Sequence, residues 1–197
     1  MYIELPRHGL RINVIVPVGC LFLLLLNGVL AFTVMLLAAA VHELGHILAA
    51  KLCKARICRF DIELWGGKLQ YEGLFGYKQE LLISIGGIVL NTLTAPIGLC
   101  PLFGLYGRLF FYSSLCYAAV NSVPAPSLDG AVALSCILRM KTDIRSAMTA
   151  ERTVEVFSIF VLVAIGAIFC IISGLNSSVL FLCVLTVVLM VEKPTHH

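Results

Sequence analysis

The sequence predicts an all-α polytopic membrane protein, with about six transmembrane helices and a small membrane-surface β-hairpin between the second and third. The first observation is composition: 60% of the 197 residues are hydrophobic and only 13% are charged. A soluble domain usually carries about twice that charged fraction. The second is the mean hydropathy of +1.00. The third is that polar residues gather between apolar runs, several of which approach the roughly 20 residues that cross a bilayer. The lipid bilayer is therefore the expected surroundings of most of the chain.

The apolar runs divide a predicted single domain, residues 1–197, into spans and connections. The first run ends at Asn27-Gly28, a dipeptide typical of turns. Between the second and third runs, apolar and polar residues alternate on both sides of Gly66-Gly67, as in a β-hairpin. Such a hairpin is either a plain connection or a strand edge that binds an extended peptide. The predicted spans are 12–27, 29–53, 80–103, 106–138, 153–172 and 179–191, with the hairpin at 59–72.

The basic residues indicate the orientation of these spans. Of the 14 Lys and Arg residues, only Arg108 falls outside the termini and the even-numbered connections. By the positive-inside rule, both termini and the hairpin face the cytoplasm. The basic residues form no surface interleaved with aromatic residues, so nucleic acid is not an expected partner.

The second span carries the motif His42-Glu43-Leu44-Gly45-His46 near its C-terminal end. Residues four apart lie on one face of a helix, so both imidazoles can reach one metal ion, with Glu43 beside them to move a proton. Between residues 29 and 50 these three are the only ionisable side chains. Burying them costs several kcal/mol unless they are paired or bound to metal. The alternative is a set of hydrogen-bonded core residues, and the apolar setting favours a metal site.

A third ligand is needed, because a catalytic zinc ion usually takes three protein ligands and leaves one position open. Among the other acidic residues, only Asp129 lies inside a predicted span and away from its ends. It follows Pro124 and Pro126, which interrupt the helix. Broken backbone at membrane depth is tolerated where it is buried in protein or lines a cavity. By elimination, we expect His42, His46 and Asp129 to bind one Zn²⁺ ion per chain.

The motifs that contain these residues are similar to those of a known protein family. The sequence resembles the site-2 protease family of intramembrane zinc metalloproteases, and its compact layout and Gly66-Gly67 hairpin are most similar to the sporulation branch that activates pro-sigma-K. In the third span the family's Gly-Pro-x-x-Asn appears as Gly87 to Asn91, with Ile88 in place of proline. The two motifs that carry the resemblance are His42-Glu43-Leu44-Gly45-His46 and the Asn-x-x-Pro-x-x-x-x-Asp-Gly pattern at Asn121, Pro124, Asp129 and Gly130.

The resemblance implies an enzyme of a bacterial cell membrane that hydrolyses a peptide bond in or next to a membrane-associated segment. Its substrate would be a sigma-factor precursor or an anti-sigma factor, and inhibitory membrane proteins would be further partners. Glu43 would act as general base, and Asn121 would hydrogen-bond the polarised carbonyl. Asn121 could equally cap the broken helix.

Two other functions remain open from the sequence. CAAX-type proteases also use His-Glu-x-x-His, but they take a glutamate as third ligand, and here no glutamate except Glu43 lies deep in a span. The other alternative is a catalytically silent scaffold or transporter that binds metal. The intact Glu43 argues against a silent relative.

Overall fold

The computed structural model describes residues 2–5, 10–13, 15–63, 66–72 and 76–172, so the predicted span 179–191 lies outside the described residues. The chain divides into two compact units, Met1–Val120 and Asn121–His197. The expectation of one functional domain over 1–197 stays a prediction. The elements are β1 (Tyr2–Leu5), β2 (Leu10–Asn13), α1 (Ile15–Leu52), β3 (Arg56–Glu63), β4 (Gly66–Glu72), α2 (Tyr77–Thr94), the 3₁₀ turns η1 (Ala95–Leu99) and η2 (Pro101–Phe103), α3 (Gly104–Asn121), α4 (Asp129–Lys141) and α5 (Ile144–Ile172).

Helix α1 joins the first two predicted spans, and its backbone breaks at the position the sequence indicates. Gly28 has φ 75° and ψ 166°, which are not helical angles. Glycine adopts a positive φ at no steric cost, whereas a side chain here would be strained. The break predicted at Asn27-Gly28 is therefore confirmed. The label α1 covers the two helical stretches that meet at Gly28.

The N-terminal segment differs from the prediction, because it contributes strands rather than a polar tail. The predicted span from residue 12 is wrong at its start, since Ile12 and Asn13 belong to β2. Leu10 and Ile12 alternate with polar neighbours, and β2 pairs in parallel with β3, with Leu10 opposite Phe60. Parallel pairing joins segments distant in sequence, which local alternation over four residues is too short to reveal.

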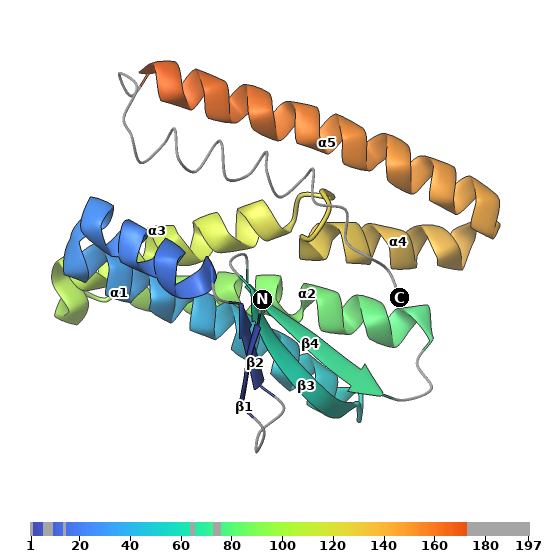
Figure 1. Ribbon diagram of the computed structural model, residues 1–197, viewed down its shortest axis with the longest axis horizontal. Coiled ribbons are helices and arrows are strands. Elements are labelled where there is room, and N and C mark those ends of the chain that lie inside the picture. The colour runs from blue at the N-terminus through green and yellow to red at the C-terminus, as the bar shows by residue number, and fades with distance from the viewer. Residues whose placement is uncertain (1, 6–9, 14, 64–65, 73–75, 173–197) are drawn as a thin grey trace. The chain divides into compact units, whose positions relative to one another are not determined.

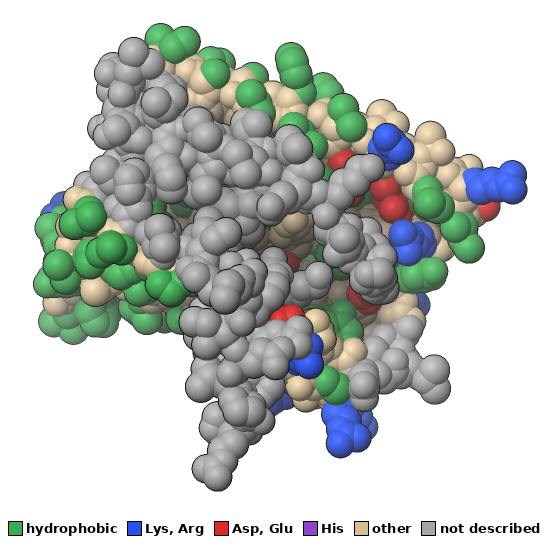
Figure 2. Space-filling view, in the orientation of Figure 1, with side chains coloured by type: hydrophobic (Ala, Val, Ile, Leu, Met, Phe, Trp, Pro, Cys, Tyr) green, Lys and Arg blue, Asp and Glu red, His purple; other side chains and the backbone are tan. Residues whose placement is uncertain are grey.

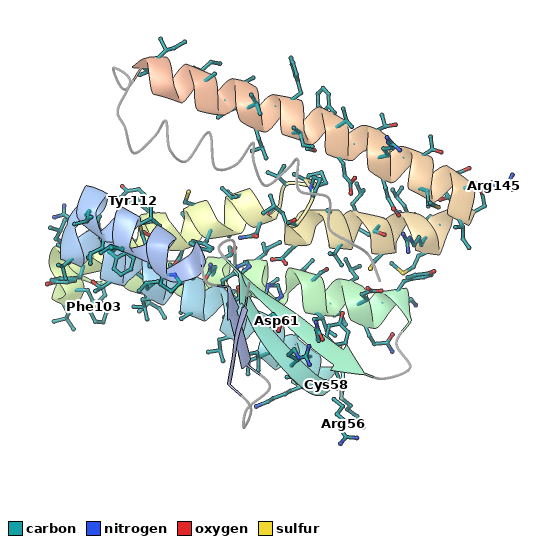
Figure 3. The ribbon with its side chains drawn as sticks, in the orientation of Figure 1. Arg56, Cys58, Asp61, Phe103, Tyr112 and Arg145 are labelled. Atoms are coloured by element: carbon teal, nitrogen blue, oxygen red, sulfur yellow. The ribbon has the colours of Figure 1, made fainter. Side chains whose placement is uncertain are left out.

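The predicted hairpin is confirmed as β3 and β4, and it extends to 56–72. The two strands pair antiparallel from Arg56 opposite Glu72 to Glu63 opposite Gly66, with an irregularity between Ile57 and Arg59. The sheet order is β1-β2-β3-β4, which makes β4 an edge strand (Figure 1). At the start of β3 the Arg56 side chain projects away from the ribbon (Figure 3).

Helix α2 packs against α1 through glycine. A Cβ on Gly86 would lie 2.6 Å from the Gly45 carbonyl oxygen, and a Cβ on Gly45 would collide with the Gly86 backbone. Small residues at a helix interface let two backbones approach closely, as in membrane helix pairs. The predicted third span, 80–103, is α-helical to Thr94 and continues as the 3₁₀ segments η1 and η2, which have Pro96 and Pro101 near their starts.

The outer faces of α1 and α2 are apolar. Helices Gly28–Leu52 and Tyr77–Leu99 are long and apolar enough to cross a membrane, yet only 22% and 33% of their most apolar windows are buried. A core helix of a soluble protein would be mostly buried, so these two helices indicate a membrane protein. Six spans stay a prediction. The exposed large side chains of the pair include Leu36, Leu37, Leu44, Leu48, Leu52, Leu82, Val89 and Leu93.

The predicted fourth span, 106–138, contains two helices. Helix α3 ends at Asn121, and α4 begins at Asp129 after a non-helical segment that holds the two prolines. Ser127 in this segment has a positive φ of 67°. The helix break expected from Pro124 and Pro126 is thus confirmed, and it separates two helices rather than kinking one.

In the second unit, α5 begins at Ile144, well before the predicted start at residue 153. The Asp143 carboxylate accepts a hydrogen bond from the Ser146 backbone N–H at 3.1 Å, and this bond lowers the pKa of Asp143. Such capping starts a helix in a polar segment, where hydropathy gives no signal. Figure 2 shows hydrophobic side chains along the outer face of α5 and basic ones at its N-terminal end, where Figure 3 labels Arg145.

Candidate metal centre

The two imidazoles of the motif converge inside the first unit. His42 and His46 lie one turn apart on α1, with only 3% and 8% of their surface exposed. Their Nε2 atoms are 3.2 Å apart, and the rings meet edge to face at 4.8 Å between centroids. At that separation either one nitrogen donates a proton to the other or both face the same cation. The predicted pairing of His42 and His46 on one helix face is therefore confirmed.

Helix α2 fixes the tautomer of His46. The Nδ1 atom of His46 lies 2.8 Å from the Ile83 carbonyl oxygen, which can only accept a hydrogen bond. Nδ1 must therefore carry the ring proton, and the Nε2 atom of neutral His46 has a free lone pair for a metal. Metal-binding histidines usually have such a partner on the other ring nitrogen.

Gly87 makes room for both rings. A Cβ at this position would lie 2.6 Å from His46 Nε2 and 2.8 Å from His42 Nε2. Real Cβ atoms do not approach other atoms this closely, so any side chain here would displace the imidazoles. The sequence analysis placed Gly87 at the start of a motif in the third span, and it did not anticipate that Gly87 faces the rings.

The predicted third ligand, Asp129, belongs to the second unit of the chain. Asp129 is the first residue of α4, and Gly130 next to it fits tightly against the preceding loop: a Cβ there would lie 2.5 Å from the Ser122 carbonyl oxygen. Its role as third ligand, expected by elimination among the acidic residues, stays a prediction.

The predicted general base contacts the hairpin. One carboxylate oxygen of Glu43, Oε1, accepts a hydrogen bond of 2.7 Å from the backbone N–H of Gly67. This bond orients the Glu43 side chain with a group that cannot change its own protonation state. The sequence predicted both the glutamate and the Gly66-Gly67 turn, but no local pattern joins two residues 24 positions apart.

Tyr117 on α3 is a further residue beside the imidazoles that the sequence analysis missed. Its ring centroid lies 5.8 Å from that of His42. Tyr117 is four residues before Asn121, so the two share a helix face. The four-residue spacing from Asn121 is the sequence signal that could have identified Tyr117. Asn121 is the last residue of α3, and its predicted role stays a prediction.

This donor set fits a zinc ion. Two imidazole nitrogens and one carboxylate are ligands that zinc takes in catalytic sites with an open fourth position. The His46 tautomer leaves a lone pair on its Nε2 atom, the His42 Nε2 atom faces it at 3.2 Å, and Gly87 gives both rings room. Calcium and magnesium prefer oxygen ligands, so the two imidazoles disfavour them.

Comparison with known proteins gives a shared fold. The structure matches that described as "Site-2 Protease from Methanocaldococcus jannaschii" with a TM-score of 0.65, covering 100% of this chain and 99% of that one. The sequences are 18% identical, so the likeness concerns the fold. No family profile and no curated protein sequence matches the chain.

Proposed function

We propose that this protein is an intramembrane zinc metalloprotease of the site-2 protease type, in which His42, His46 and Asp129 hold the metal. The observation that carries the proposal is the facing pair of buried Nε2 atoms, 3.2 Å apart, on the two histidines of the His-Glu-x-x-His motif. Burying imidazoles in an apolar helix pair costs several kcal/mol unless they are hydrogen-bonded or bound to metal. The shared fold with a site-2 protease supports the same conclusion.

The residues of the chain divide the catalytic work. Bound zinc supplies a Lewis acid that polarises the scissile carbonyl and lowers the pKa of a water to about 7. Glu43, held by the Gly67 amide, takes the proton of the attacking water and delivers it to the leaving amine. Asn121 hydrogen-bonds the oxygen that becomes negative as the carbonyl is attacked.

The hairpin gives a means to hold the substrate. A peptide bond in a transmembrane helix is shielded, so the helix must unwind before hydrolysis. Strand β4 is an edge of the sheet, and its Gly67 lies against Glu43. An unwound segment that pairs with this edge would lie beside the general base. This arrangement favours the strand-edge role over a plain connection.

The resemblance in sequence motifs supports a more specific proposal for the substrate and the membrane location. The protein is a multi-pass protein of a bacterial cell membrane with both termini in the cytoplasm. It cleaves a membrane-associated sigma-factor precursor or anti-sigma factor, and inhibitory membrane proteins regulate it. If the motif resemblance extends to the sporulation branch, the substrate would be of the pro-sigma-K type.

Co-expression with membrane-tethered candidate substrates tests this function. We expect the full chain to release a fragment, and Glu43→Gln to lower the rate at least about 100-fold while zinc stays bound, because only the general base is lost. Fragment release is followed on immunoblots, and zinc is measured on the purified protein. Cleavage by Glu43→Gln at the normal rate would contradict the general-base assignment. Metal binding with no cleavage of any candidate would favour the silent scaffold or transporter.

A further inference from the structure

His42, one of the two histidines of the proposed metal site, faces a polar side chain that the proposed mechanism does not use. Asn91 on α2 is fully buried, with 0% of its surface exposed. Its side-chain nitrogen, Nδ2, lies 3.5 Å from Nδ1 of His42. A fully buried amide in an apolar helix is costly unless its polar atoms are hydrogen-bonded. Its position against the imidazole therefore requires an explanation.

Asn91 belongs to a row of residues on α2 that all face the two imidazoles. Ile83, Gly87 and Asn91 are spaced by four and so lie along one face of the helix. The Ile83 carbonyl binds Nδ1 of His46, and Gly87 gives space for both Nε2 atoms. Asn91 occupies the place beside His42 that corresponds to the Ile83 carbonyl beside His46.

The hydrogen-bonding capacity of Asn91 indicates how it acts. In the orientation of the structure, the side-chain nitrogen points at His42, while the oxygen, Oδ1, is buried without a hydrogen-bond partner in the described part of the chain. A nitrogen donor here requires a bare Nδ1, which places the ring proton on Nε2 and removes the lone pair that a metal needs. A half-turn of the amide exchanges the two atoms. Oδ1 then accepts a hydrogen bond from Nδ1–H, and Nε2 is free to bind metal.

We propose that Asn91 is a positioning residue for the metal centre: its side-chain oxygen accepts the Nδ1 proton of His42 and so holds the Nε2 lone pair of that ring toward the metal. The inference rests on the proposed metal site, and it identifies the residue that orients His42 within that site. One imidazole is thus fixed by a backbone carbonyl and the other by a side chain, both from α2. Only the side-chain partner can be changed by substitution, which makes the inference testable.

The test compares zinc binding by full-length variants purified in detergent. Asn91→Leu keeps the approximate size but removes both polar atoms, whereas Asn91→Asp keeps an oxygen acceptor. Loss of such an outer partner costs about 10- to 100-fold in metal affinity. We expect that loss for Asn91→Leu and an affinity within about threefold of the parent for Asn91→Asp. The matched control is Thr92→Val on the same helix, since the Thr92 hydroxyl donates to the Ile88 carbonyl of its own helix. This variant should bind zinc as the parent does.

Two further readouts separate positioning from general structural damage. Thermal unfolding of the metal-free proteins reports stability alone. We expect any difference in thermal stability between Asn91→Asp and the parent to be unrelated to zinc affinity. The visible spectrum of the Co²⁺-substituted protein reports the ligand geometry, and it should change in Asn91→Leu and be restored in Asn91→Asp. If Asn91→Leu does not fold, the Asn91→Asp and parent spectra decide.

The outcomes are distinguishable. Equal zinc affinity of the parent and a folded Asn91→Leu would overturn the inference and leave the proposed protease intact. Equal losses in Asn91→Leu and Asn91→Asp would also overturn it, because the acceptor would then be irrelevant. A parent protein that binds neither Zn²⁺ nor Co²⁺ would overturn the proposed function and this inference together.

Discussion

Two helix pairs in this protein treat their polar side chains in opposite ways. Between α4 and α5, the hydroxyl of Ser135 and the guanidinium of Arg139 both donate to the Glu151 carboxylate, at 2.9 and 3.1 Å. Between α1 and α2, the buried imidazoles of His42 and His46 face each other instead. The first set satisfies itself, while the second directs two nitrogen atoms at one point.

The packing of the two pairs explains this difference. Arg139 is 38% exposed, so water and the ion pair share its solvation. At the α1–α2 interface, Gly45 and Gly86 let the two backbones meet, and Gly87 makes room for the rings where a side chain would displace them. A buried polar cluster beside a glycine that gives its rings room is a candidate site for a ligand, whereas a self-paired cluster near the surface is a contribution to stability.

The largest effect is expected from filling that space. Gly87→Ala would place a methyl group 2.6 Å from His46 Nε2, so the imidazoles must move apart. We expect zinc affinity to fall by more than about 100-fold, beyond the usual cost of losing an outer hydrogen bond. Zinc titration of the purified variant checks this.

Ser84→Ala is the control for Gly87→Ala. Ser84 is buried on the same helix, but its hydroxyl bonds to the Leu81 carbonyl of that helix. It should bind zinc as the parent does. A Gly87→Ala protein with normal affinity would show that the rings do not need this space, and the comparison between the two helix pairs would lose its physical basis.

An intermediate effect is expected from the hairpin. Gly67→Pro removes the backbone N–H that binds Glu43, and it leaves the metal ligands untouched. We expect kcat to fall about tenfold, a part of what a general base contributes, with zinc content unchanged. Gly67→Ala retains the N–H and should lose less activity than the proline variant. Equal activity in the two variants would remove the amide from the mechanism.

The smallest effect is expected at the self-paired cluster. Arg139→Ala breaks a partly exposed ion pair, which is worth about 1 kcal/mol or less in the free energy of unfolding. Thermal unfolding in detergent measures that loss, and both zinc content and cleavage should be unchanged. Loss of zinc from this variant would mean that the α4–α5 cluster is not merely structural.

The sequence was informative where the determinants are local. The break at Gly28, the hairpin around Gly66-Gly67 and the non-helical segment before Asp129 each depend on the conformational preferences of a few adjacent residues. The candidate ligands could be proposed from the sequence because charged and imidazole groups are conspicuous inside apolar runs.

The features that could not be predicted depend on packing between distant segments. The parallel pairing of β2 with β3 joins residues about 50 positions apart, such as Leu10 and Phe60. The contacts of Gly67 with Glu43 and of Tyr117 with His42 likewise arise only when elements dock. The helical start of α5 depends on a polar cap at Asp143, which hydropathy does not register.

Zinc content is the most direct measurement of the central claim, that two imidazoles and an aspartate hold one dication. The full chain is purified in detergent and its bound metal is measured beside His46→Ala and Asp129→Ala. The account predicts one zinc ion per chain in the parent and a substantial loss in each variant, since a catalytic zinc site needs all three ligands. A metal-free parent, or an Asp129→Ala protein that holds zinc as tightly as the parent, would contradict it.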